Sequence, residues 1–295
     1  MIGKGFQEYL TYEKRFSKHT VEAYLNDLAQ FSGYLNDLEI EHYYFVTTQT
    51  VRSWVVSLVE QGLSPSTLHR KMSSVNTFYK YLLKKGEVNT NPIKGIQLPK
   101  LPQRLPKFIE QKDIEELMSN LEADSKSFAS LRDRLVFELF YATGIRRQEL
   151  IALSWTDVDF SSQQLKIFGK GGKERNVPIG KALIELLQEY HQVCQKAWSA
   201  FNDKGRVILT DKGKPAYPSL IYRIVNSGLK SVNVKTQKSP HALRHTFATH
   251  LLNEGAPLND IKELLGHASL ASTQIYTHNS IEKLKQVFKR SHPKA

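Results

Sequence analysis

A proline-rich segment near residue 100 divides this chain into two parts. Three prolines lie within residues 98–107, too densely for a helix, and the same segment carries three positive charges. We therefore assign residues 99–107 as a linker between a domain over 1–98 and a second domain over 108–295. A chain of 295 residues is long enough for two domains of ordinary size, each with its own hydrophobic core.

The part before the linker has the periodicity of amphipathic helices. Apolar residues recur at steps of three and four over 21–38, behind Ser17, a residue type that caps helix N-termini. A second such pattern begins at Ser64, which is followed by a proline suited to the first helical turn, and it ends at Gly86. A shorter amphipathic pattern covers 51–59. The N-terminal domain is therefore predicted to be all helical.

The part after the linker mixes helices and strands. Two short strands are expected at 164–168 and 175–179, joined as a β-hairpin through the basic tip Gly169-Lys170-Gly171-Gly172-Lys173. Residues 206–209 are a further candidate strand. Helices are expected over 131–142, 147–154, 180–198, 217–229, 240–253, 258–265, 269–277 and 280–290. The predicted fold class is mainly α with a small β-sheet, an all-helical N-terminal domain being followed by a mixed α+β domain.

The chain is strongly basic. Lys and Arg number 41 against 29 Asp and Glu, which gives a formal net charge of +12 and a sequence pI of about 9.5. A polyanion is therefore the expected partner, and an acidic small substrate is disfavoured. Charge alone fits an ordinary basic enzyme equally well, so the motifs have to decide.

The sequence predicts a soluble protein of the cytoplasm. The single cysteine, Cys194, excludes an internal disulfide and suits a reducing compartment, and its place in a helical pattern indicates a structural role. The N-terminus has no apolar leader, and no stretch reaches the roughly 18 apolar residues of a membrane span. We expect a chain that is neither processed nor inserted in a membrane.

Two arginines after the linker lie in segments suited to phosphate chemistry. Arg146 lies in residues 142–150, ATGIRRQEL, and Arg244 in residues 240–245, PHALRH. A guanidinium presents its donors as a rigid fork that matches the non-bridging oxygens of a phosphoryl group. Two arginines on different segments can therefore clamp one such group, although an arginine taken singly is more often part of a surface salt bridge.

Two histidines and a tyrosine lie in the same half of the chain. His241 and Arg244 are three residues apart on one face of a helix that begins behind Ser239, and a helix N-terminus favours a bound phosphate. His267 ends the run Leu-Leu-Gly-His, and Tyr276 follows it by nine residues. Taken singly, such a histidine is more often a structural side chain or a helix cap, and such a tyrosine is more often half-buried packing.

In this order and at these separations, the segments resemble the signature of tyrosine site-specific recombinases, the lambda-integrase family, and in particular its Xer-type members. The family's catalytic lysine comes first in a hairpin tip Gly-Lys-Gly-x-Lys-Glu-Arg, which residues 169–175 match at every fixed position. Arg147 stands where family members usually have another residue type, but the Gly-Ile before and the Glu-Leu after this pair favour Arg146. The resemblance covers essentially the whole chain and is strongest over 142–278. It implies the catalytic set Arg146, Lys170, His241, Arg244, His267 and Tyr276, with Tyr276 as the nucleophile.

The resemblance implies an exchange of phosphodiester bonds that uses no metal and no nucleotide cofactor. Tyr276 attacks the scissile phosphate while Lys170 protonates the departing 5′-oxygen, and a 5′-hydroxyl of a partner duplex then reverses the step at the 3′-phosphotyrosyl enzyme. His241 accepts the tyrosine proton, and the other three members of the set hold the phosphoryl oxygens. Glu149 either orients these groups through hydrogen bonds or only lies on the helix surface. No histidine has cysteine or carboxylate partners at ligand spacing, so no metal site is expected.

The resemblance also implies that both domains contact double-stranded DNA, and that a homo- or hetero-tetramer assembles on two duplexes. The N-terminal domain is then a SAM-like core-binding domain that clamps the duplex. A C-terminal helix at about 280–290, with Leu284, Val287 and Phe288 on its apolar face, docks on a neighbour. The involvement of a second recombinase or a DNA translocase is left open. Candidate phosphate contacts, each also explained by a solvated surface, are Arg70, Lys71, Lys80, Lys84, Lys85, Lys173 and Arg175.

Three alternatives stand beside this interpretation. A type IB topoisomerase shares the Tyr/Arg/His/Lys chemistry, but the N-terminal helical domain and the closing helix favour a recombinase. A DNA-binding protein with an inactive site is disfavoured by the intact set of six. An integrase or transposase of a mobile element differs mainly in cellular role from a Xer protein that resolves chromosome dimers, and the lack of an additional arm-binding N-terminal domain favours the Xer-type role. The target DNA sequence is not predicted, because base contacts depend on geometry.

Overall fold

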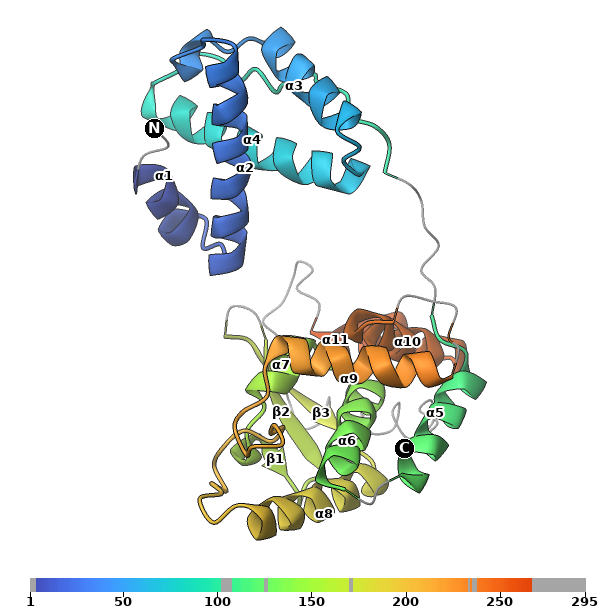
Figure 1. Cartoon of the computed structure of the whole chain (residues 1–295). Coiled ribbons are helices and arrows are strands. Elements are labelled where there is room, and N and C mark those ends of the chain that lie inside the picture. Colours follow the sequence, from blue (N-terminus) through green and yellow to red (C-terminus); the bar gives the residue numbers. More distant parts are fainter. Residues whose placement is uncertain are drawn as a thin grey trace. The chain divides into compact units, whose positions relative to one another are not determined.

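The computed structural model describes residues 4–101, 108–124, 127–169, 172–232, 234 and 238–266. The chain divides into two compact units, 1–104 and 105–295, and the division falls inside the segment assigned as the linker (Figure 1). Each unit has its own hydrophobic core. None of the described helices is both long and apolar enough to span a membrane.

The described part of the N-terminal unit consists of helices and their connections. Ser17 and Ser64 cap the two long helices, each by accepting a hydrogen bond from the backbone N–H three residues on, and Gly86 ends the second one with a φ of 73°. The predicted helices of this unit are confirmed. Their bounds are α1 (Lys4–Glu8), the π-helical turn η1 (Tyr9–Glu13), α2 (Lys18–Asp37), the 3₁₀ turn η2 (Tyr43–Phe45), α3 (Thr48–Glu60) and α4 (Pro65–Lys85).

The C-terminal unit combines helices with a small antiparallel sheet. Its three strands follow the order β1-β2-β3, and in the predicted hairpin Leu165 pairs with Val177 and Ile167 with Arg175. Its described elements are α5 (Gln111–Ala123), α6 (Phe128–Thr143), α7 (Arg147–Ala152), η3 (Trp155–Asp157), β1 (Val158–Asp159), β2 (Gln164–Phe168), β3 (Glu174–Pro178), α8 (Lys181–Ala197), α9 (Pro218–Ser231), α10 (Pro240–Asn253) and α11 (Leu258–Leu265).

The predicted hairpin and the predicted mainly helical fold are confirmed, with two differences in detail. Residues 206–209 do not form a strand, because Arg206 and Leu209 make only isolated bridges to other segments and no continuous ladder. Helix α5 and the two-residue strand β1 are absent from the predictions above. The helices expected at 269–277 and 280–290 lie outside the described residues.

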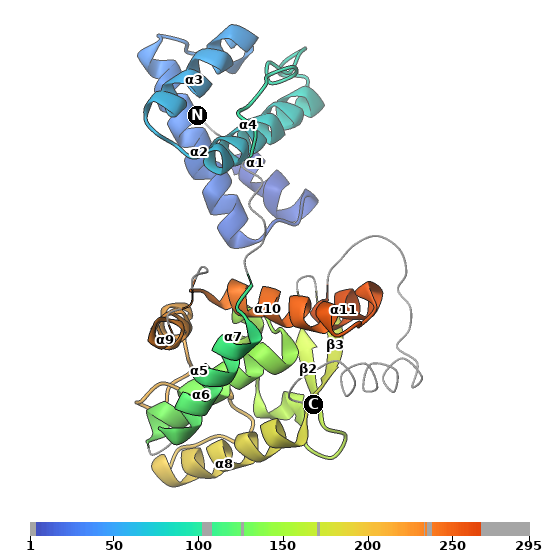
Figure 2. The same cartoon turned by 90° about the vertical axis from the view of Figure 1, so that its right-hand side faces the viewer.

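Helix α6 is the centre of the C-terminal unit. Every residue from Leu135 to Thr143 is buried, and α5, α8, α9 and α10 pack around the helix (Figure 2). A helix that is buried on all sides belongs in the interior of a fold. Its C-terminal end is consequently fixed from several directions, and that end leads through Gly144 to Arg146.

Gly144 is expected to tolerate no side chain. Its φ is +57°, and an added Cβ would lie 2.5 Å from Cδ1 of Phe247 and 2.8 Å from Cδ2 of Leu265. Gly144→Ala should lower the free energy of unfolding by about 3 kcal/mol, because a strained backbone and an overfilled core each cost about 1–3 kcal/mol. Gly255→Ala is the control, since Gly255 has a φ of +83° but nothing within 4 Å of an added Cβ. Urea unfolding that shows equal losses for both variants would contradict the packing argument.

Candidate functional site

The turn between α6 and α7 places Arg146 and Glu149. Gly144 ends α6 in the left-handed conformation, and Arg146 is the N-cap residue of α7. Glu149 accepts hydrogen bonds from the backbone N–H of Arg146 at 2.9 Å and from its Nη1 at 2.7 Å. The carboxylate thus caps the helix and orients the guanidinium in one arrangement. Of the two roles considered for Glu149, orientation through hydrogen bonds is the one that its contacts support.

Helix α10 carries His241 and Arg244 near its N-terminus. Its N-cap residue is Ser239, whose hydroxyl accepts a hydrogen bond from the backbone N–H of Ala242, and Pro240 lies in the first turn. His241 is exposed in that turn, whereas Arg244, one turn further in, is 8% exposed. The two side chains therefore differ strongly in their access to solvent.

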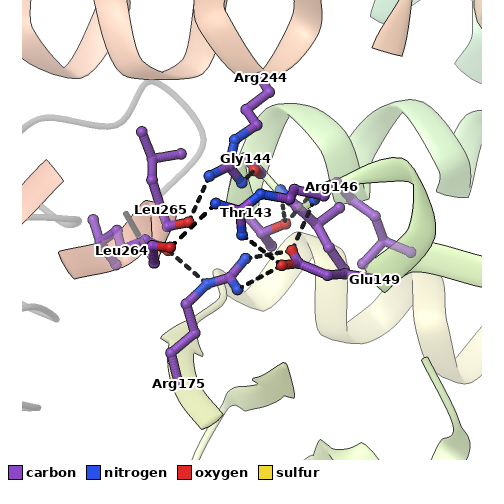
Figure 3. Close-up of polar contacts among 11 residues, drawn as sticks. Thr143, Gly144, Arg146, Glu149, Arg175, Arg244, Leu264 and Leu265 are labelled. Carbon is purple, nitrogen blue, oxygen red and sulfur yellow. Dashed lines mark hydrogen bonds and ion pairs between the residues drawn. The ribbon is translucent and has the colours of Figure 1, made fainter. Parts of the chain in front are cut away.

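The guanidinium groups of Arg244 and Arg146 meet at the ends of α6 and α11. Arg244 donates to the carbonyl of Gly144 and, at 2.5 Å, to the carbonyl of Leu265. Arg146 donates through Nη2 to the carbonyl of Gly266 at 3.1 Å. Figure 3 shows Arg244 and Arg146 approaching this point from different helices. Two predicted phosphate-binding residues, 98 positions apart in the chain, are thus brought together.

Arg175 is a third arginine at this site, and its contacts disfavour the predicted role as a DNA contact. The side chain is 5% exposed and points inward from β3, where its donors are engaged within the protein. Its Nη1 and Nη2 donate to the two carboxylate oxygens of Glu149 at 3.1 and 2.7 Å, and its Nε donates to the carbonyl of Leu264 at 2.8 Å. The alternation of β3 carried the signal for this burial, because Arg175 shares a strand face with Val177, which is fully buried.

Electrostatics at the site favour an anion. The pKa of Glu149 is lowered from 4.5 to about 2, because hydrogen bonds and charge from Arg175 and Arg146 outweigh burial, which by itself would raise it. Burial lowers the pKa of Arg244 to about 10, and the charges of Arg146 and Arg175 add to this effect. Arg244 is still protonated at neutral pH. Three guanidinium groups therefore face the one carboxylate of Glu149, which leaves positive charge to attract an anionic group.

Half of the predicted catalytic set lies within the described residues. Arg146 and Arg244 come together, and His241 lies one turn before Arg244 on α10. On the hairpin, Lys173 is exposed. Three predicted members lie outside the described residues: Lys170, His267 and Tyr276.

The N-terminal candidates for DNA contact divide into one buried side chain and four exposed ones. Lys71 is 3% exposed and donates to Asp27 at 3.2 Å, which disfavours the predicted phosphate contact. The other four lie on exposed positions of α4, although Arg70 also pairs with Asp27 and Lys84 with Glu13. The exposed candidates, which stay predictions together with Lys173, are Arg70, Lys80, Lys84 and Lys85.

Both units match domains of known proteins. Residues 107–283 match the phage integrase family, and residues 4–86 match the N-terminal SAM-like domain of phage integrases. The chain belongs to the phage integrase family. Tyrosine recombinase XerC of Listeria innocua is 37% identical over 295 residues, which cover 100% of this chain and 98% of that protein. XerC of Bacillus subtilis is 36% identical over 294 residues, which cover 99% and 96%.

Solved structures share the fold. XerH site-specific recombinase bound to palindromic difH substrate aligns with a TM-score of 0.71 at 24% identity, covering 90% of this chain and 78% of that one. With the sequence similarity to XerC, this makes the chain a Xer-type tyrosine site-specific recombinase, an enzyme that breaks and rejoins DNA. The family, fold class and enzyme class predicted from the sequence are confirmed.

Glu149→Gln is expected to destabilise the C-terminal unit in a pH-dependent way. A carboxylate with a pKa of 4.5 when unfolded and about 2 when folded contributes about 3 kcal/mol above pH 5, and this contribution fades as the pH falls toward 2. The variant should therefore be less stable than the parent by about 3 kcal/mol or more at pH 7, with a smaller difference at pH 3. Urea unfolding at both pH values measures this, with Glu189→Gln on the exposed surface of α8 as the control. A stability difference that does not change with pH would contradict the assignment.

Proposed function

We propose that this enzyme cuts and rejoins DNA through a 3′-phosphotyrosyl intermediate, and that its cellular role is the resolution of chromosome dimers. The observation that carries the proposal is the convergence of Arg146 and Arg244 on one point beside the end of α11. A phosphoryl group in transfer spreads negative charge over its non-bridging oxygens, which paired guanidinium forks match in geometry and charge. Arg146 is 34% exposed in its side chain and so can reach a bound duplex.

Each chemical step is assigned to a residue of the set. The Tyr276 oxygen forms a bond to phosphorus as the bond from phosphorus to the 5′-oxygen breaks, and Lys170 gives that oxygen its proton. His241, exposed in the first turn of α10, takes the proton of the tyrosine. The two converging arginines and His267 hold the non-bridging oxygens. A 5′-hydroxyl of a partner duplex then attacks phosphorus and releases the tyrosine, so the number of phosphodiester bonds is conserved.

Covalent capture on DNA tests the proposed function. Genomic DNA of the source organism is incubated with the protein and denatured, and the fragments that stay covalently attached are sequenced. We expect adducts at one or a few sequences, each with the protein on a 3′-phosphate. Binding without any adduct would support the alternative of a DNA-binding protein with an inactive site, and adducts without sequence preference would support a topoisomerase.

The recovered sites also test the chromosomal role. The XerC relatives of Listeria innocua and Bacillus subtilis match this chain over nearly their full length, which supports the same role here. A single adduct site on the chromosome is then expected, and the enzyme works in the compartment that holds the chromosome, the cytoplasm. Adduct sites at the ends of a mobile element would instead identify an integrase or a transposase.

We further propose that four protomers act on two duplexes, joined by the segment at about 280–290. A lambda integrase tetramer bound to a Holliday junction shares the fold with a TM-score of 0.67 at 16% identity, covering 92% of this chain and 73% of that one. Truncation after Ser280 removes Leu284, Val287 and Phe288 and should abolish cooperative binding to a full site while one half-site is still bound. Native gel electrophoresis measures both. Undiminished cooperativity would mean that this segment does not join protomers.

A further inference from the structure

Three arginines from three elements hold three consecutive carbonyl oxygens at the end of α11. Carbonyls at a helix C-terminus lack partners within the helix and carry the negative end of its dipole, so cations stabilise them. The chain continues from these residues directly into His267. Each arginine has its own carbonyl. Arg175 donates to that of Leu264 and Arg244 to that of Leu265 (Figure 3), and Arg146 donates to that of Gly266.

Arg175 is held differently from the other two arginines. All three of its guanidinium nitrogens are engaged, Nε with the carbonyl of Leu264 and both Nη atoms with the carboxylate of Glu149. The described contacts of Arg244 are only with neutral carbonyls, which an anionic phosphate can replace. A side chain that is 5% exposed and bound to a carboxylate has no such freedom. Arg175 is therefore suited to keep its contacts when DNA binds.

The end of α11 lies directly against the side chain of Arg175. A Cβ added at Gly266 would lie 3.2 Å from Cδ and 3.2 Å from Nη1 of Arg175, and Gly266 has a φ of +63°. The backbone thus lies close enough to the guanidinium that a side chain at this position would be in tight contact with it. A displacement of Arg175 would release this backbone, and the next residue along the chain is His267.

We propose that Arg175 is a positioning residue for strand cleavage. It holds the end of α11 and the carboxylate of Glu149 while Arg146 and Arg244 leave their carbonyls and bind the scissile phosphate. The inference rests on the proposed function, because that function assigns those two arginines to the phosphate. Once Arg146 and Arg244 bind the phosphate, the end of α11 keeps one of its three arginine contacts. This contact is the hydrogen bond from Arg175 to the carbonyl of Leu264. The backbone at Gly266, directly before His267 in the chain, then keeps its place.

The same side chain connects the end of α11 to the hairpin. Arg175 lies opposite Ile167 in the β2-β3 ladder, and the tip between these strands contains Lys170. The carboxylate that Arg175 binds also orients Arg146. One buried guanidinium therefore links the segments that carry the general acid, a phosphate-binding arginine and a histidine. Removing it should slow the chemical step far more than it weakens DNA binding.

Arg175→Met and Arg175→Lys test the inference in the full-length protein. The substrate is a nicked duplex that carries the site at which the parent protein itself forms covalent adducts. Single-turnover adduct formation at saturating protein should slow by about 100-fold for Arg175→Met, the effect of a misplaced catalytic group. The dissociation constant for the duplex should change by less than about threefold. Arg175→Lys can donate to one acceptor but not as a fork, so it should recover part of the rate.

The pH dependence of the rate separates positioning from a loss of stability. Arg146, Arg175 and Arg244 are the charged groups that face Glu149 among the described residues. Without Arg175, burial raises the pKa of Glu149, so the rate of Arg175→Met relative to the parent should fall further from pH 7 to pH 5. Arg132→Met is the matched control, because Arg132 is also 5% exposed and paired with carboxylates, those of Asp133 and Asp211. Its relative rate should not change with pH.

The outcomes distinguish this inference from the proposed function. A parent protein that forms no adduct on any DNA would refute the proposed function and this inference with it. A parent that forms adducts, beside an Arg175→Met variant that forms them equally fast, would overturn the role of Arg175 alone. A slower rate that Arg132→Met reproduces at equal loss of stability would overturn it as well. If Arg175→Met does not fold, Arg175→Lys serves for the same comparison.

Discussion

Tyr276→Phe should eliminate the covalent protein–DNA adduct while the protein still folds and binds its site. The substitution removes one oxygen and very little volume, so the surfaces that contact DNA are unchanged. The oxygen is the atom that bonds to phosphorus in the proposed reaction, and no neighbouring group replaces a lost nucleophile at a comparable rate. We expect the rate of adduct formation on a nicked duplex to fall at least about 10⁴-fold, as it does when other enzymes lose their nucleophile.

Tyr222→Phe is the control for this result. Tyr222 is exposed on α9 and also contributes a phenolic hydroxyl, so it reports the effect of removing a surface hydroxyl without touching the site. Its adduct rate should equal that of the parent. Denaturing gel electrophoresis resolves the adduct from free protein. A Tyr276→Phe variant that still forms the adduct would exclude Tyr276 as the nucleophile.

Lys170→Ala should slow cleavage of normal DNA by about 10²–10⁴-fold, the contribution of a general acid. The proposed duty of Lys170 is to protonate the 5′-oxygen as it leaves. Sulfur in place of that bridging oxygen gives a leaving group that needs no proton, so the variant should cleave the sulfur-substituted duplex nearly as fast as the parent does. The ratio of the two cleavage rates, measured for each protein, isolates proton transfer from binding.

Lys173→Ala is the matched variant on the same hairpin tip. Lys173 is exposed and is a candidate for phosphate contact, so its loss should weaken DNA binding without favouring the sulfur substrate. If Lys170→Ala is impaired equally on both substrates, Lys170 is a binding residue. If Lys173→Ala is the variant rescued by sulfur, the general acid is Lys173.

The helical framework was predictable because burial of one helix face sets the spacing of the apolar residues. Over 21–38 and 64–86 this spacing agrees with local capping signals at Ser17 and Ser64, and the structure contains both helices. The hairpin was predictable for a similar reason, since alternation marks β2 and β3 and glycines mark the tip. The apolar run over 206–209 was a candidate strand, but it reflects only the burial of Val207 and Ile208. The segments beside it form isolated bridges and no continuous ladder.

The unexpected burial of Lys71 and Arg175 has a common physical cause. Both were predicted as surface cations, but each forms a buried ion pair with a carboxylate far away in the chain. Asp27 is 44 residues from Lys71, and Glu149 is 26 residues from Arg175. Composition shows that opposite charges are available, whereas only the packing of α2 on α4, or of β3 beside α7, determines which of them meet. The motifs pointed to Arg146, Glu149 and Arg244, but not to the carbonyls to which the two arginines donate.

The carbonyl contacts at the end of α11 bear on how the enzyme discriminates among anions. Free phosphate and nucleotides surround a DNA-binding protein in the cell, and two unengaged guanidinium groups would attract them. Here both terminal nitrogens of Arg244 donate to carbonyls, and those of Arg146 donate to Gly266 and Glu149. A small anion gains only the difference between its own contacts and those that it displaces. A phosphate within a duplex is bound together with many further phosphates along the same strand, which add to the affinity. We therefore expect the enzyme to bind mononucleotides weakly and to bind the phosphate of a DNA site tightly.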